Sequence, residues 1–308
     1  MKARELGALL LLGSIWGASY LFIKVAVQVF PPLTLVTLRV VMAALTSLLI
    51  LRLRGIALPR SRALWGTFLV MGLFNGAVPY SLITWGEQRI DSGLTAILIA
   101  TSPIFTAIFA HLFLHDERMT VTKIVGILLG FAGVAILIGP DAIAGAGQNL
   151  AGDVAVILAA ASYGATIVYA RKHLRGVAPM AASAGQMVMA SAAILPVALL
   201  VEQPWRLSLS DAGIVLPAVA SLVMLAVVGT SLAYLLYYWL IREVGATNAS
   251  LVTYISPFTS ILWGTLLLGE RLKAADFVGF GFILAGLAVI NGYVRQIAQR
   301  FSAAGAGR

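Results

Sequence analysis

Cysteine is absent from this chain of 308 residues, and charged residues make up only 11% of it. Without cysteine the chain can form neither a disulfide nor a thiolate metal site. The small share of charge, beside 60% hydrophobic residues, excludes an ordinary soluble protein, because a soluble core could not bury so much apolar surface. The sequence therefore predicts an integral membrane protein.

Long apolar stretches fill almost the whole chain. A helix needs about 20 apolar residues to cross a bilayer, and its backbone groups must be satisfied within the segment. We therefore predict an all-α membrane protein with ten transmembrane helices. Because the eighth stretch is too long for a plain span, its start is expected after Pro217. The predicted spans are 6–28, 32–51, 63–85, 93–114, 121–139, 153–171, 178–200, 213–240, 247–269 and 274–294.

Basic residues are distributed unevenly between the connections. Of the 21 lysines and arginines, 15 fall on the side of the N-terminus, 4 fall on the other side, and Lys24 and Arg39 lie within predicted helices. This bias follows the positive-inside rule. We expect a multi-pass protein of the inner (plasma) membrane with both termini in the cytoplasm. The net charge of +9 thus reflects the lipid bilayer, and a nucleic-acid partner is not expected.

The two halves of the chain resemble each other. The segment that begins SPIFTAIF at Ser102 matches the segment that begins SPFTSILW at Ser256, and Glu117 matches Glu270. The repeated unit contains five predicted helices, an odd number, so its two copies cross the membrane in opposite directions. Transporters with such inverted repeats place the substrate site between the halves. The predicted repeats are residues 1–147 and 148–308, within one membrane domain.

These features resemble a known superfamily. The ten-helix plan, the Ser-Pro pair within the fourth and ninth spans, the Glu-Arg dipeptide before the next span and the matched glycines are similar to the drug/metabolite transporter superfamily, EamA type. The run WGASYLFIKVAV in the first span further resembles the YddG-like exporters of aromatic and other amino acids. The resemblance implies a transporter of small organic molecules.

Aromatic residues near the expected membrane midplane are candidates for substrate contact, because they offer apolar area with one polar group. Tyr80 and Tyr234 occupy equivalent positions in the two halves, and Tyr163 matches Trp16. The alternative is that such residues anchor the helices at the membrane interface. The candidates, with one neighbouring amide, are Trp16, Tyr20, Asn75, Tyr80, Tyr163, Tyr234 and Tyr254.

Prolines within predicted spans are the second set of candidates. A proline removes one helical hydrogen bond and clashes with the carbonyl four residues earlier. Pro103 and Pro257 are equivalent, and Ser102 and Ser256 are close enough to satisfy the freed carbonyls or to line a cavity. Pro79 adds a third position. Paired hinges, cavity walls and purely structural kinks all remain open.

Charged groups inside the predicted spans are few. All 12 acidic residues fall in or beside predicted connections, whereas a proton-coupled pump usually has a carboxylate within the membrane. Arg39 is a possible charged pathway residue. His111 is a second one, although packing is its simpler role. Lys24 is near the end of its helix and is expected to extend to the interface.

The scarcity of reactive groups also helps to distinguish an enzyme, a channel and a transporter. An enzyme would need a nucleophile, an acid–base pair or a metal, so we expect no catalytic residue, metal or cofactor. A channel would need a continuous pore with carbonyl or charged rings. We expect a transporter, as a monomer, that exports neutral or zwitterionic small molecules such as hydrophobic amino acids by alternating access without proton coupling. A nucleotide-sugar or other metabolite or drug carrier and a proton-coupled exporter are the alternatives.

Overall fold

The computed structural model describes residues 2–114, 119–143, 148–207, 211–249, 252–271 and 273–290. Within these ranges every regular element is a helix. In chain order the elements are α1 (Ala3–Ala26), α2 (Pro32–Leu53), α3 (Arg62–Gly72), the π-helix η1 (Leu73–Ala77), α4 (Val78–Gly86), α5 (Ser92–Ile99), α6 (Ser102–Phe113), α7 (Val121–Ile143), α8 (Gln148–His173), α9 (Pro179–Val201), the 3-10 helix η2 (Pro204–Arg206), α10 (Ala212–Val223), the π-helix η3 (Met224–Leu232), α11 (Ala233–Ala249), α12 (Val252–Trp263), the π-helix η4 (Gly264–Leu268) and α13 (Ala274–Ile290).

Many of these helices have the length and composition of membrane spans. In the described part of the chain seven segments qualify, and three shorter apolar helices accompany them. The all-α, multi-pass prediction is therefore confirmed, while the count of ten spans stays a prediction. The seven segments are Ala3–Ala26, Pro32–Leu53, Arg62–Gly86, Ser92–Phe113, Asn149–His173, Pro179–Val201 and Ala212–Tyr237, and the shorter ones are Val121–Ile136, Ile255–Leu268 and Ala274–Ile290.

The eighth predicted span differs from the structure. Its start was expected after Pro217, but α10 begins at Ala212, because the Asp211 carboxylate accepts a hydrogen bond from the backbone N–H of Gly213 at 2.9 Å and caps the helix. The helix then continues through η3 and α11 to Ala249. A wide π-helical turn takes up part of the extra length. The predicted boundary at Pro217 was wrong because the cap, and not the proline, sets the start.

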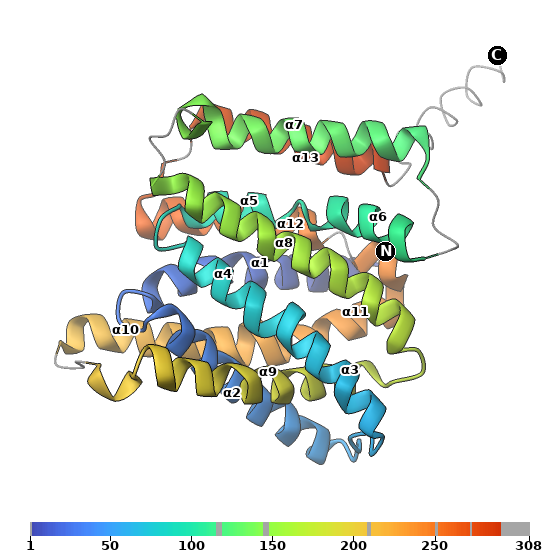
Figure 1. Ribbon diagram of the computed structural model, residues 1–308, viewed down its shortest axis with the longest axis vertical. Helices are drawn as coiled ribbons and strands as arrows, with labels where there is room; N and C mark the ends of the chain where they lie inside the picture. Colours follow the sequence, from blue (N-terminus) through green and yellow to red (C-terminus); the bar gives the residue numbers. More distant parts are fainter. Residues whose placement is uncertain are drawn as a thin grey trace.

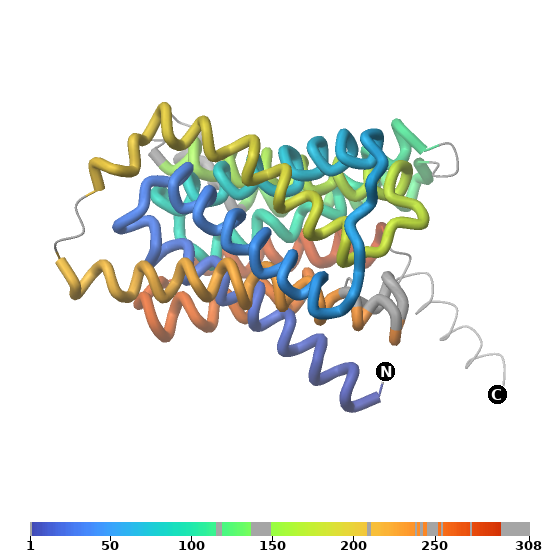
Figure 2. The backbone as a smooth tube through the Cα atoms, turned by 90° about the horizontal axis from the view of Figure 1, so that it is seen from below, coloured from blue at the N-terminus to red at the C-terminus, as the bar shows by residue number. Residues whose placement is uncertain are grey.

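The helices of the two halves are interleaved. In Figure 1 the paired helices α7 and α13 lie at one edge of the bundle, and α2 lies near the opposite edge against α9. Seen from below, segments from both ends of the sequence alternate across the bundle (Figure 2). Helix α1 packs on α12, and the equivalent helix α8 packs on α6. The halves thus exchange equivalent contacts, as an inverted repeat requires.

Two glycines at equivalent positions permit this exchange. A Cβ atom on Gly17 would come within 2.8 Å of the Ser260 backbone nitrogen, and one on Gly164 within 2.8 Å of the Thr106 backbone nitrogen. Ser260 and Thr106 are themselves equivalent, 154 residues apart. Small residues let helices approach closely in lipid. Each half therefore places the first helix of its repeat directly against the backbone of the other half.

Candidate functional site

Arg39 lies at the junction of both halves. Its side chain, from α2, is only 7% exposed. The Nε–H group donates a hydrogen bond to the hydroxyl of Thr230 in η3 at 3.3 Å, and the guanidinium carbon lies 4.0 Å from the centroid of the Tyr80 ring in α4. A cation over an aromatic face is stabilised by the ring quadrupole. Arg39 thus joins α2, α4 and the π-helical turn of the second half.

Three of the predicted tyrosines belong to two adjoining apolar clusters. Tyr80 is buried in an apolar cluster that includes Val40 and Ala77. Tyr163 of α8 packs against that cluster and also against a second one, which Tyr20 of α1 contacts as well. Of the three, Tyr80 is in direct contact with Arg39, and Tyr163 connects the cluster of Tyr80 with the cluster that Tyr20 contacts.

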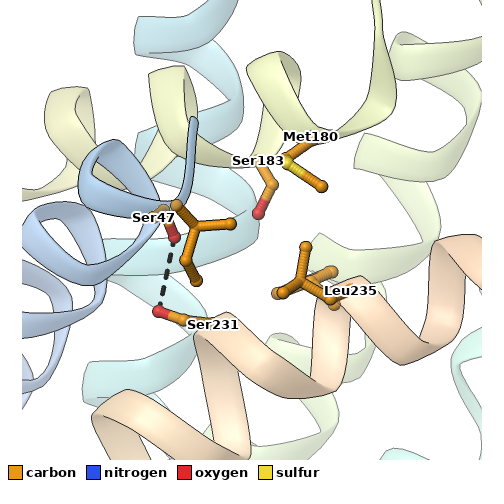
Figure 3. A pocket seen from close by; sticks show the side chains of 7 residues that line it. Ser47, Met180, Ser183, Ser231 and Leu235 are labelled. Atoms are coloured by element: carbon orange, nitrogen blue, oxygen red, sulfur yellow. Dashed lines mark hydrogen bonds between the residues drawn. The ribbon is translucent and has the colours of Figure 1, made fainter. Parts of the chain in front are cut away.

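Trp16 and Tyr234 form a neighbouring aromatic group. Their ring centroids are 6.3 Å apart in an edge-on arrangement, and the Trp16 ring also lies 5.3 Å from the ring of Tyr237. Tyr234 lines a small pocket together with Ser47 and Ser231, whose hydroxyl groups are hydrogen-bonded at 3.3 Å (Figure 3). The cavity volume of about 10 Å³ is enough for roughly one water molecule. In this conformation the pocket is therefore too small to hold an organic molecule.

Asn75 forms a polar bridge that the sequence did not predict. Its amide nitrogen donates to the Gln186 side chain of α9 at 3.2 Å, and its amide oxygen accepts from the Thr166 hydroxyl of α8 at 3.2 Å. Asn75 itself lies in η1, where π-helical geometry projects the side chain between the other two helices. In this conformation the amide nitrogen and oxygen of Asn75 therefore both take part in hydrogen bonds within the protein.

The predicted prolines have unequal effects. At Pro103 the span is broken between α5 and α6, and the Ser102 hydroxyl donates to the freed carbonyl of Ile99 at 2.6 Å. Pro257 lies within the continuous helix α12, and Pro79 lies in the first turn of α4, directly after η1. The symmetric pair of prolines therefore gives one break and one uninterrupted helix in this conformation.

The remaining predicted residues lie apart from Arg39. Ser256 is buried where α12 meets Gly17 of α1. His111 is exposed in the last turn of α6, and its Nδ1 atom accepts a hydrogen bond from the Met119 backbone at 3.1 Å. The structure does not bring His111 to the central group. Tyr254 belongs to α12, but its side chain lies outside the described part of the chain.

Sequence reasoning missed the burial of Glu87. This residue follows α4, in a connection as predicted, yet its side chain is 0% exposed and neither carboxyl oxygen has a hydrogen-bond partner. The Lys24 ammonium donates instead to the backbone carbonyls of Glu87 and Ile90, both at 2.7 Å. Burial raises the pKa of the Glu87 carboxyl well above its usual value, and the charge of Lys24 only partly offsets this. The one feature of the sequence that could have indicated this burial is Lys24, which was expected to extend to the interface at the end of its helix.

Two further glutamates connect the halves at the end of the bundle where α9 ends and α5 begins, which lies opposite the N-terminus (Figure 1). We call this the distal end. The Glu202 carboxylate accepts from the backbone N–H groups of Leu33 and Thr34 at 2.9 and 2.6 Å, and the Glu270 carboxylate accepts from the Ser92 backbone and hydroxyl at 3.0 and 2.7 Å. Each carboxylate thus caps the N-terminus of a helix in the other half, where the helix dipole favours negative charge.

Comparison with known proteins places the chain in a family. The model of the EamA-like transporter family matches residues 4–139 and 150–292. The uncharacterized inner membrane transporter YedA of Escherichia coli K12 is 32% identical over 94% of this chain and 93% of its own, and the uncharacterized transporter YoaV of Bacillus subtilis is 26% identical over 89% and 91%. One solved crystal structure, 18% identical, has a TM-score of 0.63 over 96% of this chain and 100% of its own, and shows a similar fold. The chain belongs to the EamA-like transporter family, a family of two-repeat membrane transporters and not of enzymes.

Proposed function

We propose that this protein exports small neutral or zwitterionic organic molecules, aromatic and other hydrophobic amino acids in particular, across the inner membrane. The observation that carries the proposal is the aromatic group at the junction of the two halves, in which Tyr80 lies against Arg39 and Tyr163 joins the clusters of Tyr80 and Tyr20. Such a group offers apolar area together with hydroxyl donors, which suits an amphipathic molecule. The name of the relative YedA supports the inner membrane as the location.

The mechanism we propose is alternating access between two five-helix halves, residues 1–147 and 148–308, with ten spans in total. Two features support it. The Glu202 and Glu270 contacts join the halves at the distal end, and equivalent helices exchange contacts across the junction. Breaking the two carboxylate contacts would open the distal end while the rest of each half stays packed. By the positive-inside bias the distal end faces outward, away from the cytoplasm.

Transport in this proposal follows the substrate gradient without proton coupling. Glu87, Glu202 and Glu270 lie at the ends of helices, and in the described part of the chain none of them is hydrogen-bonded to Arg39, Tyr20, Tyr80 or Tyr163. A zwitterion is nearly neutral as a whole, so its binding requires no proton uptake. Outward movement follows because the cytoplasm holds the higher concentration of amino acids.

Purified protein in proteoliposomes provides the test. Labelled phenylalanine inside the vesicles is expected to equilibrate with the outside, and a protonophore is expected to leave the initial rate unchanged. Unlabelled hydrophobic amino acids should compete, whereas nucleotide sugars should not. Competition by nucleotide sugars but not by amino acids would favour the alternative function, a nucleotide-sugar carrier. Uphill accumulation driven by an imposed pH gradient would show proton coupling and contradict the mechanism.

A further inference from the structure

Arg39 is a buried cation with most of its donors unused. A guanidinium carries five N–H donors, yet among the described residues Arg39 makes a single hydrogen bond, from Nε to Thr230. Its side chain is 7% exposed. Burying a charge without a hydrogen-bonded partner is costly. The arrangement therefore leaves the two terminal nitrogen groups available to an acceptor that the protein itself does not supply.

The nearest ionisable groups do not serve as that acceptor. Glu87 lies close enough for its charge and that of Arg39 to influence each other, but both of its carboxyl oxygens lack a hydrogen-bond partner. Tyr80 meets the Arg39 guanidinium through its ring, and Lys24 is engaged with backbone carbonyls. No carboxylate in the described part of the chain is hydrogen-bonded to Arg39.

The guanidinium is also held in a fixed position. The Tyr80 ring lies under one face at 4.0 Å. The Thr230 hydroxyl, which accepts from Nε, itself donates to the Leu225 carbonyl within η3 at 2.8 Å, so its orientation is set by the π-helical turn. With Nε and one face occupied, the edge formed by the two terminal nitrogens makes no hydrogen bond within the described part of the chain. A planar fork of this kind matches a carboxylate through two parallel hydrogen bonds.

We propose that Arg39 binds the carboxylate of the transported molecule, so that the substrate class is small organic carboxylates with an apolar or aromatic side chain. This inference rests on the proposed function, and it adds an anchoring group and a chemical requirement to it. The side chain of the substrate packs among Tyr20, Tyr80 and Tyr163, while Arg39 fixes the other end. Amines and amides without a carboxylate lack the group that pairs with the buried charge.

The first test uses the unmodified protein. Proteoliposomes are loaded with labelled phenylalanine, and its exchange is measured against phenylalanine, 3-phenylpropionate, phenylalaninamide and phenethylamine outside. We expect the two carboxylates to compete and the amide and the amine to be weaker by roughly tenfold or more, as for loss of a charge-assisted hydrogen bond. Equal competition by all four would overturn the role of Arg39 and leave the proposed function intact. Absence of labelled phenylalanine exchange under all four conditions would overturn the proposed function, and the inference with it.

The second test uses substitutions. Arg39→Gln is expected to weaken phenylalanine binding roughly 10- to 100-fold, and Arg39→Lys by less, since lysine keeps the charge but not the fork. Binding is read from substrate-dependent thermal stabilisation in detergent, which does not require turnover. Phenylalaninamide should bind both variants as it binds the unmodified protein. The matched control is Arg54→Gln, an exposed arginine beyond the end of α2. Unchanged phenylalanine stabilisation in Arg39→Gln would contradict the proposal.

Discussion

At the scale of single residues, the aromatic group around Arg39 is the part of the molecule most open to test. Tyr80→Ala removes the ring beneath the guanidinium and is expected to lower the transport rate about 2- to 30-fold, the range of a cation–π contact. Tyr234→Ala removes the partner of the Trp16 ring and should also reduce transport. Phe at either position should retain more activity than Ala.

The control for this pair is Tyr169→Ala, because Tyr169 stacks on His173 near the end of α8, away from Arg39. Vesicle transport should be normalised to the amount of folded protein, measured by gel filtration in detergent. Normal rates in both alanine variants would remove the two tyrosines from the pathway.

Glu87 gives a prediction about pH at the same scale. Its pKa is raised in the folded protein, so the folded state binds this proton more tightly than the unfolded state does. The resulting stability is fully present below the ordinary glutamate pKa of about 4.3 and is lost as the pH rises through the raised pKa. The Tm of the unmodified protein in detergent should therefore fall as the pH rises above that ordinary value. Glu87→Gln should flatten this decline.

A matched variant tests whether the Glu87 carboxyl is the cause. Its exposed neighbour Gln88 has no titratable group, so Gln88→Ala should leave the pH dependence of Tm as it is in the unmodified protein. A decline of equal size in the Glu87→Gln and unmodified proteins would show that another group is responsible.

At the scale of elements, two π-helical turns lie at equivalent positions of the two halves. Adding 154 to the bounds of η1 gives residues 227–231, which lie within η3. Asn75 in η1, and Thr230 and Ser231 in η3, all hydrogen-bond to other helices. π-helical turns in α-helices are often found at functional sites. Both halves thus use an irregular turn at the same place to position a polar side chain.

Helix packing gives the prediction at this scale. Gly17 and Gly164 each face the backbone of the other half, with no space for a side chain, so Gly17→Leu or Gly164→Leu should destabilise the protein by about 1–3 kcal/mol, the usual cost of overpacking. The Tm in detergent measures this loss. Gly66→Leu is the control, because a Cβ atom on Gly66 meets nothing within 4 Å. Equal Tm values for all three variants would show that the close approach is absent in solution.

At the scale of the whole molecule, the open question is which end faces the cytoplasm. The absence of cysteine allows single cysteines to be placed at will. Ala57→Cys, beyond the end of α2, should resist an impermeant thiol reagent added to intact cells, and Gln203→Cys, at the distal end, should react with it. Labelling of position 57 but not of position 203 would reverse the predicted orientation. Labelling of both after membrane disruption is the control for access.

Much of the fold was accessible from the sequence because a bilayer imposes one simple rule, a long apolar helix, on every span. Each of the first four predicted spans begins and ends within a few residues of the bounds of the observed apolar segment. The prediction was wrong at Pro217, where a capping carboxylate decided the start of α10. The repeat paired Tyr80 with Tyr234 and Tyr163 with Trp16, whereas in the structure the Tyr234 ring meets the Trp16 ring. The interactions of Asn75 with Gln186 and Thr166 were not expected either, since they join three helices far apart in the chain.

The sequence by itself determined the membrane environment, the helical class, the repeat and the scarcity of charge, because these properties depend on composition and on local spacing. Only the tertiary structure decided which polar groups are paired. Glu87 and Glu202 both follow the end of a helix, yet Glu202 caps a helix of the other half while Glu87 is buried without a hydrogen-bond partner. Arg39 likewise could have met a carboxylate, and instead it meets a tyrosine ring. The physical reason is that pairing depends on contacts between helices distant in sequence, which local patterns do not encode.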